Sequence, residues 1–140
     1  MPSDSPPTPP AKRRPAARRP TILVAEDEDA VRTFVRLALD HGGFTVVATP
    51  NGRAAGELFD ADPHAFDLVL TDIIMPFVNG VELAARVRAR RPDLPVLFMS
   101  AIHGGTELAP DPLPPDEPVL EKPFTMARLL EVVNAALGAR

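Results

Sequence analysis

The stretch FDLVLTD, residues 66–72, shows what kind of fold this chain adopts. Its apolar residues follow one another without the regular polar alternation of a strand that faces water, so both faces of the strand are expected to be buried. Short runs of the same kind recur on either side of it, as TILVA (21–25), FTVVAT (44–49), PVLFMS (95–100) and PVLE (118–121). Strands that are buried on both faces are typical of parallel sheets covered by helices.

Helical patterns separate these runs. Asn51 and Thr125 are predicted to cap two of the helices at their N-termini. Strands that alternate with helices form parallel sheets with right-handed crossovers. The sequence therefore predicts an α/β fold with a doubly wound, five-stranded parallel sheet. Apolar residues recur at intervals of three and four within 29–40, 51–60, 80–91 and 125–138.

The segment between the fourth and fifth predicted strands lacks a helical pattern. Residues 101–118 read AIHGGTELAPDPLPPDEP, with two glycines and five prolines. Proline removes a helix hydrogen bond and clashes with the preceding turn, and glycine is a poor helix former. We therefore expect a proline-rich loop where the other connections have a helix.

Proline and charge also separate an N-terminal tail from the folded domain. Residues 1–20 hold seven of the 18 prolines and have no aliphatic residue larger than alanine after Met1, so they cannot bury enough surface to fold. The tail carries a net charge of +4, whereas residues 21–140 carry −8. We expect a disordered, solvated basic tail over 1–20 and one domain over 21–140. Binding of the tail to nucleic acid or anionic lipid is the alternative, and nucleic acid is not an expected partner of the domain.

The composition excludes several classes of protein. The chain has 140 residues, 45% of them hydrophobic, which suits one domain with its own core. It has no cysteine, which excludes disulfides, thiolate metal sites and a cysteine nucleophile. No apolar run is as long as a membrane span, and none forms the core of a secretory signal, so we expect a cytoplasmic location.

Acidic side chains follow two of the predicted strands at their carboxyl ends, where doubly wound sheets place functional groups. Glu26 and Asp27 follow the first strand, and Asp72 ends the third. If these strands are neighbours, the three carboxylates repel one another unless a cation lies between them, and oxygen ligands of this kind suit Mg²⁺. The simpler interpretation is that the aspartates cap a helix and begin a turn.

Two more polar residues lie at the same edge of the predicted sheet. Ser100 ends the fourth strand, and Lys122 follows the fifth. Lys122 is the only lysine of residues 21–140, which have nine arginines, so a compact cation here indicates chemistry more than solubility. An ammonium group and a hydroxyl facing the acidic cluster can both donate hydrogen bonds to phosphoryl oxygens.

Five motifs together resemble the receiver domain of two-component response regulators. They follow one another in the family's order, and the resemblance covers residues 21–140. It implies a flavodoxin-like sheet with the strand order 2-1-3-4-5, and a cis peptide bond between Lys122 and Pro123. The motifs are ILVAED (22–27), LTDIIMP (70–76), NG (79–80), FMSA (98–101) and EKPF (121–124).

The resemblance implies the residues of a phosphorylation site. Asp72 is the implied phosphoacceptor, which attacks the phosphorus of a phosphohistidine on a histidine kinase or a histidine phosphotransfer protein. Lys122 would contact a phosphoryl oxygen, and Ser100 would donate its hydroxyl to another. A receiver of this kind phosphorylates itself without turning over as an enzyme. It would signal by protein contact, or serve as an intermediate or sink in a phosphorelay.

The resemblance also implies a metal site. Mg²⁺ would be held by Glu26, Asp27, the carboxylate of Asp72 and the backbone carbonyl of Ile74, and would neutralise charge on the moving phosphoryl group. The acid pair is Glu-Asp where the family commonly has Asp-Asp, and Asn79 stands where an aspartate is common. Both changes leave the metal site possible.

Several positions depart from the family in ways that bear on signalling. Val119 stands where an aromatic residue usually works with the serine as a switch, so that switch is not expected. The proline-rich residues 110–118 take the place of a helix of the output face, so a different signalling surface is expected. Ile74 and Ile102 flank the implied route of the hydrolytic water. Because hydrocarbon side chains cannot orient water, we expect a long-lived aspartyl phosphate.

Two other functions fit parts of the pattern. One is a phosphorylation-independent interaction module with a relict receiver site, against which the complete set of Asp72, Lys122 and Ser100 argues. The other is a phosphatase of the aspartyl-phosphate type, which needs a second acid where this chain has Ile74. A stand-alone regulator and a receiver from a hybrid sensor kinase fit the motifs equally well.

Overall fold

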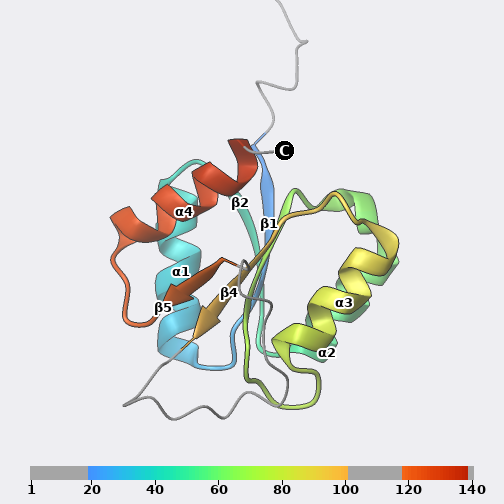
Figure 1. Cartoon of the computed structure of the whole chain (residues 1–140). Helices are drawn as coiled ribbons and strands as arrows, with labels where there is room; N and C mark the ends of the chain where they lie inside the picture. Colours follow the sequence, from blue (N-terminus) through green and yellow to red (C-terminus); the bar gives the residue numbers. More distant parts are fainter. Residues whose placement is uncertain (1–18, 101–117, 139–140) are drawn as a thin grey trace, which may run out of the picture.

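The computed structural model describes residues 19–100 and 118–138, which form one parallel sheet between two layers of helices (Figure 1). The strand order is β2-β1-β3-β4-β5, and each neighbouring pair is parallel. The predicted α/β fold, the parallel sheet and the strand order are therefore confirmed. The strands are β1 (Thr21–Ala25), β2 (Thr45–Thr49), β3 (Leu68–Asp72), β4 (Val96–Ser100) and β5 (Val119–Glu121).

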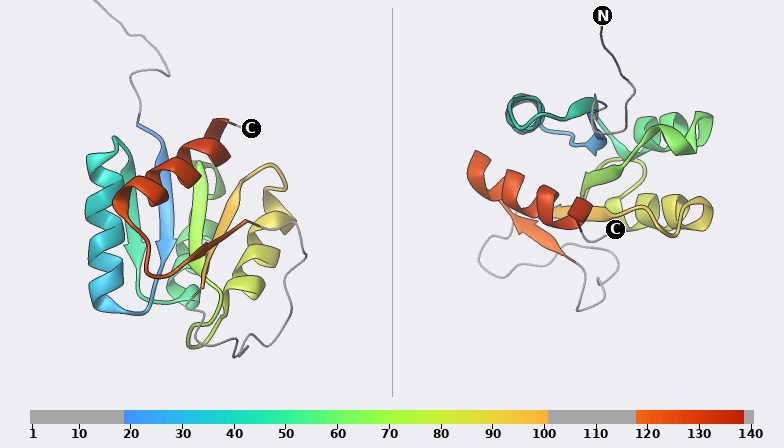
Figure 2. Two further views of the ribbon diagram at one scale, coloured as in Figure 1. Left: turned by 60° about the vertical axis from the view of Figure 1, so that its left-hand side comes forward. Right: turned by 90° about the horizontal axis from the view of Figure 1, so that it is seen from above.

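Helices cover both faces of the sheet (Figure 1, Figure 2). α1 and α4 lie on one face, and α2 and α3 lie on the other. All four predicted helices are present, with their ends within one residue of the predicted bounds. The helices are α1 (Asp29–His41), α2 (Gly52–Ala61), α3 (Gly80–Arg90) and α4 (Met126–Gly138), and a short 3₁₀ turn (Pro63–Ala65) precedes β3.

Strand β3 shows why the predicted strands have no polar alternation. Leu68 and Leu70 belong to the hydrophobic cluster under α1 and α4, whereas Val69 belongs to the cluster under α2 and α3. Every residue of β3 is buried. Because each face of the strand meets a helix layer, Leu68, Val69 and Leu70 are all buried, and burial of one such side chain contributes about 1.5–3 kcal/mol.

Asparagine and threonine side chains cap three of the helices at their N-termini, and the caps at Asn51 and Thr125 are the predicted ones. Asn51 accepts a hydrogen bond at 2.8 Å from the backbone N–H three residues further on, and Thr125 accepts the equivalent bond at 3.0 Å. Asn79 caps α3 in a reciprocal pair with Glu82, with bonds of 2.8 and 3.0 Å. The caps at Asn51 and Asn79 fix the ends of the loops that lie at the carboxyl edge of the sheet.

Two glycines allow the loop between β3 and α3 to lie close to its neighbours. A Cβ atom at Gly80 would collide with the carbonyl oxygen of Asp72, and one at Gly52 would collide with the carbonyl oxygen of Val78. Both obstacles are backbone atoms, so rotation of a side chain cannot relieve them. The loop is therefore held between the first turns of α2 and α3.

Two predictions fall on parts of the chain that the structure does not describe. The proline-rich loop predicted between β4 and β5 lies outside the described residues, as does the predicted tail apart from Arg19 and Pro20. Arg19 donates to the carbonyl oxygens of Gly43 and Phe44, both at 2.9 Å. Within residues 19–100 and 118–138, no helix has the length and apolar character needed to cross a membrane.

Candidate functional site

Three carboxylates meet at the carboxyl edge of the sheet, because β1 and β3 are neighbours. Glu26 and Asp27 follow β1, and Asp72 is the last residue of β3. One oxygen atom from each carboxylate lies within 4.8 Å of the other two. The backbone N–H of Glu26 donates to the carbonyl oxygen of Thr49 at 3.1 Å, so the chain leaves β1 in line with the sheet. Three negative charges are thereby placed at one point.

Lys122 lies between two of these carboxylates. Its Nζ atom is 2.7 Å from Asp72 Oδ1 and 2.8 Å from Glu26 Oε1. The backbone N–H of Lys122 donates to the carbonyl oxygen of Ser100 at 2.9 Å, which continues the pairing of β4 with β5. Glu26 is completely buried, and its second oxygen accepts a bond from the backbone N–H of Glu28 at 2.9 Å. Both oxygens of Glu26 are thus paired within the protein.

The buried acid at the end of β3 binds its proton unusually tightly. Burial raises the pKa of Asp72 from 3.8 to about 8, and the neighbouring Glu26 adds to this rise while Lys122 opposes it. Burial lowers the pKa of Lys122, but the contacts with Asp72 and Glu26 outweigh that effect and leave the pKa raised. Near neutral pH the cluster therefore retains a proton or attracts a further cation.

An unpaired oxygen of Asp72 marks where such a cation would fit. Asp72 Oδ2 is buried and has no hydrogen-bond or ion-pair partner in the described part of the chain. Lys122 offsets only one of the three carboxylate charges. A buried charge without a partner is costly, and Mg²⁺ binds oxygen ligands of this kind. Glu26, Asp27 and Asp72 therefore fit a magnesium ion.

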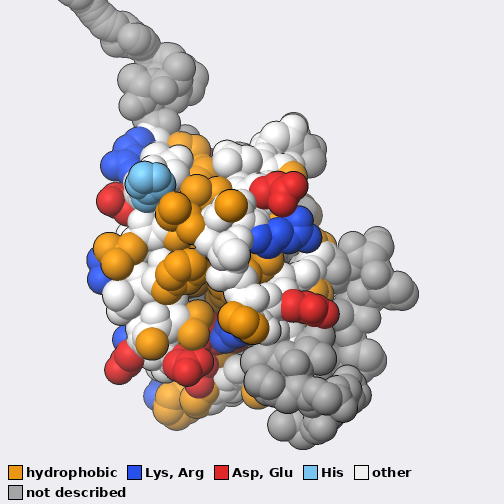
Figure 3. Space-filling model, turned by 90° about the vertical axis from the view of Figure 1, so that its left-hand side faces the viewer, with side chains coloured by type: hydrophobic (Ala, Val, Ile, Leu, Met, Phe, Trp, Pro, Cys, Tyr) orange, Lys and Arg blue, Asp and Glu red, His pale blue; other side chains and the backbone are white. Residues whose placement is uncertain are grey.

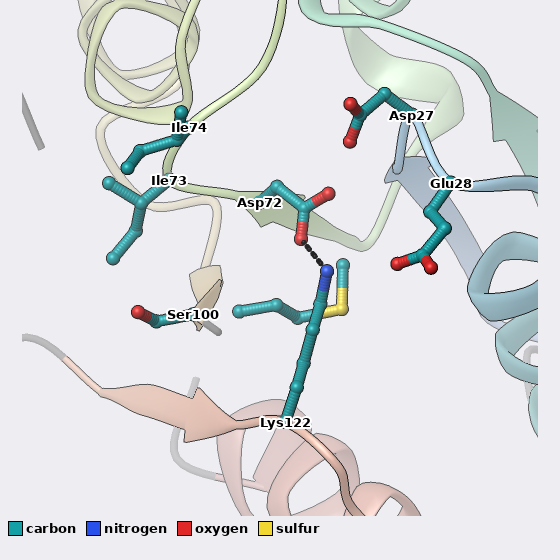
Figure 4. Close-up of a pocket in the computed structure, with 8 residues that line it drawn as sticks. Asp27, Glu28, Asp72, Ile73, Ile74, Ser100 and Lys122 are labelled. Atoms are coloured by element: carbon teal, nitrogen blue, oxygen red, sulfur yellow. Dashed lines mark ion pairs between the residues drawn. The ribbon is translucent and has the colours of Figure 1, made fainter. Parts of the chain in front are cut away.

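A cavity of about 200 Å³ opens onto Asp72 (Figure 4). The side chain of Asp72 is only 5% exposed, so a reactant reaches it through this cavity. In Figure 4 the Lys122 ammonium points at Asp72, whereas the hydroxyl of Ser100 points away from it. The cavity is lined by Asp27, Glu28, Asp72, Ile73, Ile74, Met99, Ser100 and Lys122.

An arginine of α1 holds the loop that carries Asp27. Arg32 Nη1 donates to the carbonyl oxygen of Glu26 at 2.9 Å, and its Nη2 lies 2.5 Å from Asp29 Oδ1. Asp29 opens α1, where a negative charge interacts favourably with the helix dipole. These contacts tie the acidic loop to the first turn of the helix.

The described residues that the sequence singled out for the site all lie at this edge, but they differ in their access to the cavity. Glu26 is completely buried and does not line the cavity, whereas Asp27 does. Ile74 lines the cavity, and its side chain is 49% exposed; Ile102 lies outside the described residues. Met99 was not identified from the sequence as a residue that lines the cavity. Its position directly before Ser100, the last residue of a predicted strand, could have indicated it.

A second hollow lies beside the first, between α1 and the turn after β5. The ring centroids of Phe34 and Phe124 are 6.1 Å apart there, so Phe124 packs against α1. Val119 on β5 is 37% exposed. Figure 3 shows hydrophobic side chains gathered on this side of the molecule. The hollow is lined by Glu28, Ala30, Val31, Phe34, Lys122, Pro123 and Phe124.

The Lys122–Pro123 peptide bond is cis, as the resemblance implied.

Comparisons with known proteins find relatives over most of the chain. Residues 22–134 match the family model described as the response regulator receiver domain. The chain is 39% identical over 119 residues to the response regulator receiver protein CpdR of Brucella abortus, a match that covers 84% of this chain and 97% of CpdR. It is 38% identical over 125 residues to the DNA-binding transcriptional regulator NtrC of Rhizobium meliloti, where the match covers 84% of this chain but 24% of NtrC.

Solved structures agree with these sequence matches. A response regulator receiver protein from Sinorhizobium medicae WSM419 superimposes with a TM-score of 0.74 at 31% identity, covering 88% of this chain and 98% of that one. The receiver domain of the hybrid histidine kinase CckA gives a TM-score of 0.69 at 30% identity, covering 84% of this chain and 98% of that one. The arrangement of sheet and helices is therefore shared across 84–88% of this chain and nearly the whole length of each of the two solved structures.

Proposed function

Because the chain belongs to the receiver-domain family of two-component response regulators, we propose that Asp72 accepts a phosphoryl group from a phosphohistidine. The phosphohistidine would belong to a histidine kinase or a histidine phosphotransfer protein. The observation that carries this proposal is the environment of the Asp72 carboxylate. One oxygen lies 2.7 Å from Lys122 Nζ, the other has no partner among the described residues, and Asp72 lines the cavity.

The proposed reaction is a substitution at phosphorus. A carboxylate oxygen of Asp72 attacks the phosphorus atom, the phosphorus–nitrogen bond of the phosphohistidine breaks, and its electron pair returns to the imidazole ring. The released ring nitrogen takes a proton from solvent. Lys122 is proposed to donate a hydrogen bond to a phosphoryl oxygen, a role supported by its ion pair with the buried Glu26, which would continue to hold the ammonium group.

The carboxylate cluster supports a magnesium-dependent reaction. Asp27, Asp72 and the backbone carbonyl of Ile74 are proposed as ligands at the cavity, and Glu26 offers a further oxygen in the same cluster. Bound Mg²⁺ would supply positive charge to the phosphoryl oxygens. Ser100 is proposed to donate its hydroxyl to the phosphoryl group after a rotamer change, and so to report the phosphorylated state.

The proposed output is a contact with another protein, or transfer of the phosphoryl group within a phosphorelay. Receiver domains serve in signalling and not in metabolic turnover, and the match to CpdR covers nearly all of that receiver protein. The match to NtrC covers about a quarter of a DNA-binding regulator, so it does not extend DNA binding to this chain. A cytoplasmic location belongs to the same proposal.

The proposed function is tested by offering the protein a small phosphodonor. The full chain is incubated with acetyl phosphate, once with MgCl₂ and once with EDTA, and its intact mass is measured. We expect one phosphoryl adduct, formed only with Mg²⁺ and located by tandem mass spectrometry on the peptide that contains Asp72. If no adduct forms under conditions that phosphorylate a known receiver, the phosphorylation-independent interaction module becomes the better interpretation.

Ile74 is expected to lengthen the lifetime of the aspartyl phosphate. Its exposed hydrocarbon side chain lines the cavity and cannot orient an attacking water molecule. Replacing it by asparagine supplies a hydrogen-bonding group, so Ile74→Asn is expected to hydrolyse its phosphate roughly tenfold faster, less than the ~10²–10⁴-fold of general acid–base catalysis because an amide orients water without taking its proton. The decay is followed by intact mass after removal of the donor. Leu37→Asn, an equally polar change on the exposed surface of α1, is the control; equal lifetimes for all three proteins would contradict the prediction.

A further inference from the structure

An exposed aromatic residue lies in a strained conformation in the loop between β3 and α3. Phe77 has a φ of 70°, in the left-handed region that a bulky residue rarely adopts, and its side chain is 70% exposed. The left-handed conformation costs about 1–2 kcal/mol for an L-residue, and an exposed ring recovers little of this by burial. A strained conformation whose free-energy cost is not offset by burial is a reason to look for a function.

The residue that contacts Phe77 is also unfavourably placed for the stability of its own helix. Arg53 lies in the first turn of α2, where a positive charge opposes the helix dipole and where no acidic residue compensates for it. Its guanidinium carbon lies 4.6 Å from the centroid of the Phe77 ring. Arg53 makes no ion pair with any residue that the structure describes. Phe77, which has an unfavourable backbone conformation, and Arg53, whose charge lies at the unfavourable end of a helix, therefore form a cation–π contact with each other.

Backbone contacts between the loop and the start of α2 hold this pair in a fixed place. Phe77 lies in the loop that also carries Ile74, which lines the cavity over Asp72. The close approach of Gly52 to the carbonyl oxygen of Val78 joins this loop to the first turn of α2, from which Arg53 projects. The aromatic ring and the guanidinium group thus form a firmly supported contact point on the same loop as the cavity residue Ile74.

We propose that the Phe77–Arg53 pair is an anchor for the protein that delivers the phosphoryl group, an inference that rests on the proposed function above. Because the side chain of Asp72 is only 5% exposed, a histidine on another protein reaches it only if that protein covers the entrance of the cavity. The surface that fits the pair has an apolar hollow for the Phe77 ring and a carboxylate for the guanidinium of Arg53. Phenylalanine and arginine are among the residue types enriched at protein interfaces.

The test compares a protein phosphodonor with a small one. Purified, autophosphorylated histidine kinases and histidine phosphotransfer proteins of the source organism are each mixed with the full chain, and the preferred donor is the one with the highest kcat/KM. Phe77→Asn and Arg53→Gln are expected to lower kcat/KM with that donor at least about tenfold, mainly through KM. Phosphorylation by acetyl phosphate, which is too small to touch the pair, is expected to be unchanged.

Two controls separate docking from folding. Asparagine tolerates the left-handed conformation, so the Tm of Phe77→Asn is expected to be no lower than that of the wild type. Leu58→Asn changes an apolar residue on α2 that is 43% exposed and does not line the cavity, and Arg90→Gln removes a charge at the far end of α3. Both are expected to accept the phosphoryl group from the preferred donor at the wild-type rate.

The results that would overturn the anchor proposal differ from the result that would overturn the proposed function. The anchor proposal is overturned if Phe77→Asn and Arg53→Gln keep the wild-type kcat/KM with the preferred donor, or if they lose activity with acetyl phosphate to the same degree. It is also overturned if acetyl phosphate modifies Asp72 but no phosphodonor protein does, or if the pair instead supports association of two copies of this chain, seen as a dimer that Phe77→Asn dissociates. If acetyl phosphate fails to modify Asp72 at all, the proposed function itself fails.

Discussion

Asp72→Asn is expected to abolish the phosphoryl adduct and, without divalent cations, to make the protein more stable at pH 8. The variant keeps the shape of the side chain but removes the nucleophilic carboxylate and one of three clustered negative charges. In the folded protein the pKa of Asp72 is raised to about 8, whereas the unfolded chain titrates near 3.8. The folded state therefore holds a proton that the unfolded state has lost.

The sign of the pH effect follows from that difference. The stability that protonated Asp72 contributes is fully present below about pH 4 and is lost as the pH rises toward 8. One unit of pKa corresponds to about 1.4 kcal/mol, so this carboxyl lowers the stability at pH 8 by a few kcal/mol. Removing it is expected to raise the Tm at pH 8 by roughly 5 °C or more.

Differential scanning calorimetry between pH 4 and pH 8 measures this effect. Mg²⁺ is expected to raise the Tm of the wild type, because it binds the folded cluster, and to have little effect on Asp72→Asn. Asp62→Asn removes a charge from an exposed position and is expected to leave both the pH dependence and the Mg²⁺ response unchanged. A lower Tm for Asp72→Asn than for the wild type at pH 8 would show that the carboxylate is well compensated in the absence of metal.

Gly80→Ala is expected to lower the free energy of unfolding by about 3 kcal/mol and to slow phosphorylation roughly a hundredfold. A Cβ atom at this position meets the carbonyl oxygen of Asp72 and the backbone of Ile73. These are backbone atoms at the end of a central strand, so the chain must shift instead of a side chain. The shift moves the residue that carries the reactive carboxylate, and a displacement of about 1 Å is enough for a large loss of rate.

Urea unfolding and the rate of adduct formation with acetyl phosphate measure the two effects. Gly138→Ala is the matched control, because the same methyl group is added where nothing lies within 4 Å. That variant is expected to be as stable as the wild type or slightly more so, since alanine favours a helix. A Gly80→Ala protein with wild-type stability and rate would mean that the start of α3 is not needed to hold Asp72 in place.

Much of the fold could be predicted because the signals are local. The apolar runs and the helical periodicity follow from what each segment has to bury, so strands and helices were predictable one segment at a time. The caps at Asn51 and Thr125 are also local, since each side chain bonds to the backbone three residues away. The segment 101–117, where proline and glycine replace a helical pattern, remains a prediction of a loop.

The composition of the candidate site was predictable for a topological reason. Parallel strands end at one edge, so Asp27, Asp72 and Lys122 had to lie at that edge once the strands were recognised. How these groups contact one another was not predictable. Glu26 lies in the carboxylate cluster with Asp27 as expected, but the sequence did not indicate that it is completely buried and that Lys122 and a backbone N–H contact its two oxygens.

By itself, then, the sequence determined the alternation of strands and helices and the edge of the sheet at which the acidic residues gather. Only the tertiary structure decided that Lys122 bridges Asp72 and Glu26, and that the pKa of Asp72 rises through burial. It also decided that Phe77 adopts a left-handed conformation against Arg53, in a loop held between two helix starts. The physical reason is that burial, ion pairing and strain depend on atoms from distant segments, whose distances are set only when the sheet and its helices pack together.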